Sequence, residues 1–400
     1  MASKSLSLLH YVVVFCIMVP AFADEYDISS GYPVTEPTII KNAASKGAVC
    51  LDGSPPAYHI SEGFGAGKDK WMVYLLGGAW CPTVSDCYGQ LRGHLGSSIY
   101  WNDTKQKQRF GGILHNISKS NPDFHSWTKV MVRYCDGSSF TGDVENVDPA
   151  TGQHYRGKRV FDAIVDDLLS TKRMKDAKEV LLTGGSAGGL AVIIHCDRFS
   201  NHFPGTTKVK CLSDGGFFLH SNNPLQARGL ESMFRGTFVL HNSTGALPKA
   251  CIDRMKSSGR EEYLCMFPQY IVEDVKTPLL VMATVYDSYQ INKTLSTVLY
   301  QAIKHKKISP TQYGVLETFR FQFLNVVYKT TYKLSGVFLS NCFTHTQLTF
   351  QGWHNRNYGV NNKTDTEVIG EWYFKDRSHI LEIDTNRLVK DCNDNVYINN

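Results

Sequence analysis

One serine of this chain lies in a glycine-rich stretch and could act as a nucleophile. Leu181–Ala191 reads LLTGGSAGGLA, so Ser186 lies in a Gly-x-Ser-x-Gly pattern between two apolar runs. A nucleophilic serine on a sharp turn between a strand and a helix needs small neighbours, because the strand and the helix approach each other closely there. At the start of such a helix, the amide of Ala187 would point at a developing oxyanion. The pattern therefore indicates a nucleophile, and a purely structural turn is the alternative.

The same glycines could cradle a phosphate, but their spacing argues against this role. A phosphate-binding loop requires Gly-Lys followed by Ser or Thr, whereas here Gly188 is followed by Gly189 and Leu190. A dinucleotide-binding turn requires Gly-x-Gly-x-x-Gly with an acid about 20 residues later, and these glycines do not give that spacing cleanly. We therefore expect no nucleotide, and no cofactor of any other kind.

The serine needs two partners, because its hydroxyl is a poor nucleophile until a histidine accepts its proton and an acid orients that histidine. After a Gly-x-Ser-x-Gly turn, the usual chain order is serine, acid, histidine. Asp287 ends an apolar run and is the preferred acid, and Asp214 in VKCLSD is the alternative. His345, in NCFTHTQ just past the last apolar run, is the preferred base, and His354 is the alternative.

A second glycine-rich loop could complete an oxyanion-binding site. Leu75–Cys81 reads LLGGAWC and follows an apolar run, so the amides of Gly78 and Ala79 could approach a substrate oxygen. The close spacing of Cys81 and Cys87 favours a disulfide that would hold this loop rigid. Rigidity matters because the loss of one oxyanion donor costs on the order of 3 kcal/mol of transition-state stabilisation.

Apolar runs that end beside these residues predict the strands that position them. Continuous apolar runs are typical of parallel strands that are covered on both faces. Between them lie helical patterns such as Arg159–Lys172, which has apolar residues on one face and acids on the other. This alternation indicates an α/β fold with a doubly wound, mostly parallel sheet, in which ligands bind at the carboxyl ends of the strands. The predicted strands are Lys70–Leu76, Thr128–Tyr134, Lys178–Gly184, Thr277–Asp287 and Ser335–Asn341.

The overall composition is that of a folded protein. The 400 residues are 42% hydrophobic and 20% charged, which argues against disorder. The net charge of +5 is not gathered into a Lys/Arg stripe, so we expect no nucleic-acid partner. Residues 228–262 and 300–337 also read as helical, and no Pro/Ser-rich linker divides the chain. We expect residues 24–400 to form a single catalytic domain, and we expect a monomer.

The amino-terminal residues predict export. Lys4 precedes the apolar run Leu6–Ala23, which ends in the small-residue pattern Ala21-x-Ala23. The run is short for a membrane span and its ending suits signal peptidase, so residues 1–23 are predicted to be a signal peptide. A membrane anchor is the alternative. No later run is long and apolar enough to cross a bilayer, so we expect no membrane association.

Cysteines and glycosylation sequons fit an exported chain. Ten of the eleven cysteines remain after Cys16 leaves with the signal peptide, an even number that allows up to five disulfides, Cys251–Cys265 among them. The sequence has no Cys-x-x-Cys pair and no HExxH motif, so we expect no metal site. Five Asn-x-Ser/Thr sequons predict N-glycosylation at Asn102, Asn116, Asn242, Asn292 and Asn362.

Seven motifs in order resemble one known family, the plant pectin acetylesterases, which are related to the animal Notum carboxylesterases. The motifs are KGAVCLDGSPPAYHISEGFGAG, GGAWC, YCDGSSFTGD, GGSAGGLA, SDGGFFL, YDSYQI and NCFTHTQ, and the resemblance runs from about Glu36 to Asp391. It implies a secreted α/β hydrolase of the cell wall that removes O-acetyl groups from the galacturonate residues of pectin. It also implies Ser186, Asp287 and His345 as the catalytic triad, with Gly78, Ala79 and Ala187 as the oxyanion hole. Trp80 and Tyr289 lie beside these motifs and could stack on sugar rings, or could pack in the core.

The chain departs from the family pattern near the oxyanion loop. That loop usually reads Glu-Gly-Gly-Gly-Trp-Cys, and here Leu76 replaces the acid and Ala79 replaces a glycine. Gly185 stands where a cysteine is more usual. The methyl group of Ala79 could alter the rate or the acyl preference. Two other functions therefore stay open: a Notum-like carboxylesterase that acts on another acyl ester, and a non-catalytic wall-binding protein on a hydrolase scaffold.

Overall fold

The computed structural model describes residues 25–27, 32–101, 108–350, 353–375, 379–393 and 396–398. The predicted signal peptide at residues 1–23 and the sequon at Asn102 lie outside the described residues. Within the described ranges, no helix combines the length and the apolar character that a membrane span requires.

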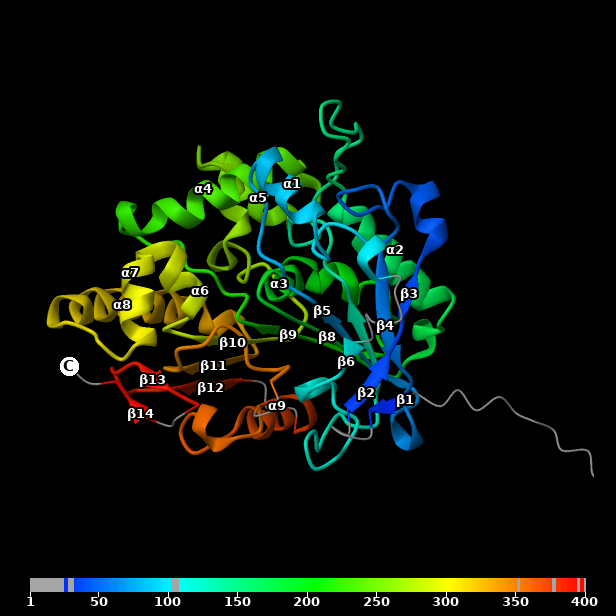
Figure 1. Ribbon diagram of the computed structural model, residues 1–400. Helices are drawn as coiled ribbons and strands as arrows, with labels where there is room; N and C mark the ends of the chain where they lie inside the picture. Colours follow the sequence, from blue (N-terminus) through cyan, green and yellow to red (C-terminus); the bar gives the residue numbers. More distant parts are fainter. Residues whose placement is uncertain are drawn as a thin grey trace, which may run out of the picture.

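A sheet of nine strands runs through the centre of the molecule (Figure 1), in the order β12-β11-β10-β9-β8-β5-β7-β4-β3. Neighbouring strands from β7 to β12 are parallel, whereas β4 is antiparallel to β7 and β3 is antiparallel to β4. The sheet strands are β3 (Pro37–Ile39), β4 (Ala57–Ser61), β5 (Lys70–Leu75), β7 (Thr128–Val132), β8 (Glu179–Gly185), β9 (Lys208–Asp214), β10 (Leu279–Thr284), β11 (Gly336–Ser340) and β12 (Ile380–Ile383). Two small sheets contain β1 (Glu25–Asp27), β2 (Tyr32–Thr35) and β6 (Gln108–Arg109), and β13 (Lys390–Asp391) and β14 (Val396–Tyr397).

Helices cover both faces of the large sheet. The helices are α1 (Val84–Leu91), α2 (Gly157–Ser170), α3 (Ala187–Ser200), α4 (Pro224–His241), α5 (Lys249–Ser257), α6 (Ser288–Gln290), α7 (Thr297–Lys304), α8 (Pro310–Thr330) and α9 (Asp365–Phe374). In Figure 1, α9 lies below the sheet, and α2, α4 and α5 lie above it. The longest helix, α8, begins at Ser309, whose side chain forms a capping box with Gln312.

Alternate residues of the central strands belong to two different cores. Val73 and Leu182 pack in the larger core with α2 and α3, whereas Met72 and Leu181 pack in the smaller core with α9. Successive strand residues point to opposite faces of a sheet, so a strand between two helical layers must be apolar at nearly every position. This arrangement explains the continuous apolar runs in the sequence.

The predicted fold class is confirmed, and each of the five predicted strands is present with small differences in its ends. The helical prediction for residues 159–172 corresponds to α2. The helical segment predicted at 300–337 is wrong in its extent, because turns at 305–309 separate α7 from α8 and β11 begins at Gly336. The antiparallel strands β3 and β4 were not predicted.

Five disulfides join all ten cysteines beyond residue 24. Cys81–Cys87 and Cys251–Cys265 pair as their spacing predicted. The other three, which the sequence left open, are Cys50–Cys135, Cys196–Cys211 and Cys342–Cys392. Disulfides of this number persist in oxidising surroundings, so they fit an extracellular protein.

Candidate active site

Ser186 lies on a strained turn between β8 and α3. Its backbone has φ 59° and ψ −125°, a conformation that residues other than glycine rarely adopt. The start of α3 lies very close to the end of β5, and only glycine fits at position 188. A β-carbon on Gly188 would fall 2.0 Å from the carbonyl oxygen of Leu75. The turn lifts the side chain above the carboxyl edge of the sheet, as a nucleophile requires.

Asp287 and His345 meet Ser186 at this edge. The Nε2 atom of His345 lies 2.6 Å from Oγ of Ser186, and its Nδ1 atom lies 2.8 Å from Oδ2 of Asp287. Asp287 is 1% exposed, and its Oδ1 accepts a hydrogen bond of 2.9 Å from the amide of Gln290. With Nδ1 donating to the carboxylate, Nε2 is free to accept the serine proton.

The charge environment favours a basic imidazole. Burial lowers the pKa of His345, but the negative charge of Asp287, the hydrogen bond to it, and the charge of Asp214 together raise it above the ordinary value. A base with a raised pKa holds an accepted proton more firmly, which suits a group that receives a proton during the reaction and returns it later.

Asp214, the alternative acid, has a different place in the site. It is 2% exposed and does not bond the imidazole; its Oδ2 accepts hydrogen bonds of 2.9 Å from the amides of Gln347 and Leu348. Its backbone oxygen accepts a hydrogen bond of 2.9 Å from the amide of Ser186. Burial raises the pKa of Asp214 to about 6. Asp214 thus connects the serine turn to the segment that carries His345, a role that the sequence analysis missed.

The alternative base, His354, lies on an exposed turn that follows the His345 segment. Neither of its ring nitrogens bonds Ser186 or an acid among the interactions of the described residues. The structure therefore groups Ser186 with the preferred acid and the preferred base, and with neither alternative.

The loop after β5 lies directly against the serine turn. A β-carbon on Gly77 would fall 2.8 Å from Cβ of Ser186 and 3.0 Å from the amide nitrogen of Ala187. Ala79 has φ 59°, and its carbonyl oxygen accepts a hydrogen bond of 2.6 Å from the Tyr134 hydroxyl, so its backbone orientation is fixed. Among the described residues, the amides of Gly78 and Ala79 donate no hydrogen bond. Ala187 is the first residue of α3, so its amide has no intrahelical acceptor. All three are available to a ligand oxygen.

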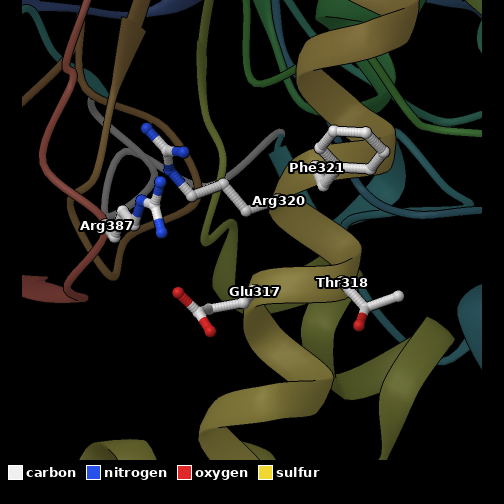
Figure 2. A pocket seen from close by; sticks show the side chains of 5 residues that line it. All are labelled: Glu317, Thr318, Arg320, Phe321 and Arg387. Atoms are coloured by element: carbon white, nitrogen blue, oxygen red, sulfur yellow. The ribbon is translucent and has the colours of Figure 1, made fainter.

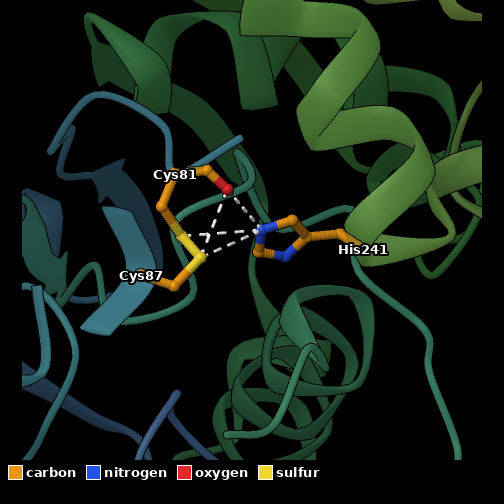
Figure 3. Close-up of side chains that lie close together, drawn as sticks. All are labelled: Cys81, Cys87 and His241. Carbon is orange, nitrogen blue, oxygen red and sulfur yellow. Dashed lines mark hydrogen bonds between the residues drawn. A yellow bond between two sulfur atoms is a disulfide. The ribbon is translucent and has the colours of Figure 1, made fainter. Parts of the chain in front are cut away.

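A buried histidine braces this loop (Figure 3). Nε2 of His241, at the end of α4, lies 3.1 Å from the carbonyl oxygen of Cys81 and 3.6 and 3.7 Å from the sulfurs of Cys81 and Cys87. Burial lowers the pKa of His241 to about 4, so the ring is neutral and donates to the carbonyl. Two cysteines and a histidine can bind a metal, but here the sulfurs bond each other and offer no thiolate.

Trp80 requires a correction, because it is a core residue. It is 5% exposed, its ring lies 4.9 Å from the rings of Phe218 and Phe234, and its Nε1 donates to the Ser139 hydroxyl at 2.8 Å. This packing leaves almost no ring surface for a sugar. Tyr289 is half-buried and stacks on the imidazole of His345, with ring centres 5.2 Å apart and planes 23° apart.

The predicted glycosylation sites within the described residues differ in exposure. Asn242 and Asn362 are exposed, whereas Asn116 and Asn292 are half-buried. Glycosylation of these residues stays a prediction.

The parallel sheet with a serine turn at its carboxyl edge is the architecture of an α/β hydrolase. A solved structure with this fold, the Wnt deacylase Notum from Drosophila, matches with a TM-score of 0.72 at 22% identity, over 88% of this chain and 97% of that one. This likeness concerns the fold.

The family model described as pectinacetylesterase matches residues 29–396, and the chain belongs to that family. It is 39% identical to pectin acetylesterase 7 of Arabidopsis thaliana over 87% of this chain and 89% of that protein. Identity to pectin acetylesterase 11 of the same plant is 37%, over 89% and 91% of the two chains. The palmitoleoyl-protein carboxylesterase NOTUM of Schmidtea mediterranea is 28% identical over 81% of this chain and 60% of its own length. The chain is therefore a carboxylic ester hydrolase of the serine type.

Proposed function

We propose that this protein is secreted to the plant cell wall and removes O-acetyl groups from pectin through an acetyl-enzyme formed on Ser186. The observation that carries the mechanism is the unbroken line of hydrogen bonds from Ser186 through His345 to Asp287. The triad is complete within one chain, so the mechanism requires no partner subunit. The substrate rests on the family and on the names of the plant relatives.

The first half of the reaction transfers the acetyl group to the enzyme. His345 accepts the proton of Ser186 as Oγ bonds to the acetyl carbonyl carbon, and Asp287 stabilises the imidazolium. The amides of Gly78, Ala79 and Ala187 donate to the tetrahedral oxyanion. The bond to the sugar oxygen then breaks, and His345 returns the proton to that oxygen.

The second half repeats these steps with water. His345 removes a proton from water, the resulting hydroxide attacks the acetyl carbon, and the Oγ–carbon bond breaks with return of the proton to Ser186. Acetate leaves with the second oxygen from water. Each atom and proton in this scheme is supplied by ester, water and the three side chains.

The testing experiment measures acetate release from acetylated homogalacturonan and from acetylated xylan, with Ser186→Ala as the matched control. We expect release from the galacturonan by the wild type and none by the variant. Release from xylan alone would overturn the pectin substrate and leave the mechanism standing. Release that Ser186→Ala does not abolish would overturn the mechanism.

A series of p-nitrophenyl esters addresses the acyl group. We expect kcat/KM to be highest for acetate and to fall with chain length, because the rings of Trp80, Phe218 and Phe234 already fill the space beside Tyr289 with protein atoms. A preference for long acyl chains would instead favour a Notum-like activity.

A further inference from the structure

Two arginines converge on a hollow that the reaction scheme does not use (Figure 2). The hollow has a volume of about 370 Å³ and is lined by Glu317, Thr318, Arg320, Phe321 and Arg387. Arg320 reaches into it from α8, and Arg387 reaches into it from the segment that follows β12. None of the triad residues lines it.

Neither guanidinium group is neutralised. Within the described chain, no ion pair joins Arg320 or Arg387 to an acid, including Glu317, the one carboxylate in the lining. Arg320 donates once, to the carbonyl oxygen of Asp384 at 3.0 Å, and its buried Nε has no partner in the described residues. A buried donor without an acceptor is costly, and a carboxylate would satisfy it.

The remaining lining fits a sugar. Phe321 is 66% exposed beside the arginines, and an exposed aromatic ring offers an apolar face to a pyranose ring. The hydroxyl of Thr318 donates to Gly314 at 2.8 Å and keeps lone pairs for a sugar hydroxyl. A planar guanidinium binds a carboxylate through two parallel hydrogen bonds. Together these groups suit a sugar acid better than a neutral sugar.

One residue of the hollow, Arg387, lies at the same edge of the sheet as the triad. Arg387 lies after the carboxyl end of β12, which is parallel to β11 and through it to β10, the strand that leads to Asp287. The backbone oxygen of Arg387 accepts a hydrogen bond from the hydroxyl of Tyr286, the residue next to Asp287. Arg387 is thus tied through Tyr286 to the segment that carries Asp287.

We infer that Arg320 and Arg387 form a subsite that binds the carboxylate of an unesterified uronate residue in the substrate chain, away from the ester that is cleaved. The identity of the sugar rests on the proposed function, whereas the binding of a sugar carboxylate rests on the hollow itself. The subsite would select chains that carry free acid groups beside the acetylated residue.

Calorimetric titration of the full chain with a short, unacetylated oligogalacturonate tests this subsite without any ester chemistry. Arg387→Glu is the test variant because Arg387 is exposed, and Arg173→Glu is the matched control because Arg173, 79% exposed, lies on a remote turn. We expect the wild type and the control to bind, and Arg387→Glu to bind at least about tenfold more weakly. A neutral xylo-oligosaccharide should not bind.

Kinetics supply the second measurement. Arg387→Glu should raise KM for an acetylated oligogalacturonate about tenfold and leave kcat/KM for p-nitrophenyl acetate unchanged. Failure of the wild type to bind oligogalacturonate, or equal binding by Arg387→Glu, would overturn the subsite. Displacement of the oligosaccharide by an equal concentration of inorganic sulfate would also overturn it, since the hollow would then hold a free anion. If the enzyme binds oligogalacturonate through Arg387 but releases no acetate from acetylated galacturonan, the subsite stands and the proposed function fails.

Discussion

Replacement of Asp214 by alanine should separate the positioning of His345 from the chemistry that His345 performs. The Asp214 carboxylate accepts the amides of Gln347 and Leu348, which follow His345 closely, while its backbone holds the amide of Ser186. Asp214→Ala keeps the backbone contact and removes both side-chain contacts. The segment that carries His345 then loses its anchor to the end of β9.

The magnitude follows from the two amides. Gln347 and Leu348 are 3% and 0% exposed, so each amide would be left buried without an acceptor, at a cost of about 1–3 kcal/mol each. The free energy of unfolding should therefore fall by about 2–6 kcal/mol. A displacement of the imidazole by about 1 Å would lower kcat by about 100-fold.

Urea denaturation and the hydrolysis of p-nitrophenyl acetate measure the two effects, with rates corrected for the folded fraction. Asp214→Asn is the companion variant, because its amide oxygen can still accept both amides, and it should recover most of the lost kcat. Asp214→Ala that is destabilised but retains the wild-type kcat would refute the positioning role. Equal losses in Asp214→Ala and Asp214→Asn would refute the assignment of the effect to these hydrogen bonds.

Three further changes probe the acid, the loop and its brace. Asp287→Asn should lower kcat by about 10⁴-fold with little change in stability, because an amide favours the wrong imidazole tautomer; a loss below tenfold in p-nitrophenyl acetate hydrolysis would contradict the triad. Ala79→Gly should leave the free energy of unfolding within about 1 kcal/mol of the wild type, because relief of the left-handed backbone strain is offset by the freedom of glycine in the unfolded chain. Ala79→Val should lower the free energy of unfolding by more than about 1 kcal/mol. Equal stability of the two variants in urea denaturation would count against backbone strain at this position. Burial lowers the pKa of His241 from 6.5 in the unfolded chain to about 4 in the folded protein. Between pH 6.5 and pH 4 the unfolded chain therefore binds one more proton at His241 than the folded protein does, and the free energy of unfolding falls as the pH is lowered through this range. His241→Gln should therefore flatten the pH dependence of unfolding between about pH 6.5 and pH 4 by about one proton, and an unchanged slope would argue against a neutral ring.

The sequence was sufficient to predict the serine turn, because its requirements are local. Gly184 and Gly188 lie against the carbonyl oxygen of Leu75 at the end of β5, and both stand within two residues of the serine. The continuous apolar runs likewise predicted a parallel sheet, since burial on both faces leaves no alternation to see. The antiparallel strands β3 and β4 lie at one edge of the sheet, and their sequences PTI and AYHIS do not form long continuous apolar runs.

The sequence favoured Asp287 over Asp214, but it could not show what separates the roles of the two acids. Asp214 ends β9 and Asp287 follows β10, and both are buried at the carboxyl edge. Only the direction of each side chain separates the acid that bonds Nδ1 of His345 from the acid that bonds backbone amides. The burial of Trp80 also depends on distant partners, Phe218 and Phe234. The pairing of Arg320 with Arg387 joins α8 to the segment after β12, and no spacing in the sequence indicates it.

Three of the five disulfides adjoin segments that form the site. Cys81–Cys87 closes the turn directly after Gly78 and Ala79, and Cys196–Cys211 joins the helix behind Ser186 to the neighbouring strand. Cys342–Cys392 ties down the segment that leads to His345. These disulfides therefore restrain segments that carry the catalytic geometry as well as the fold. Reduction of the protein should therefore loosen the active-site segments together with the rest of the fold. In recombinant production, the fraction of active enzyme should therefore depend on disulfide formation as well as on the yield of folded protein.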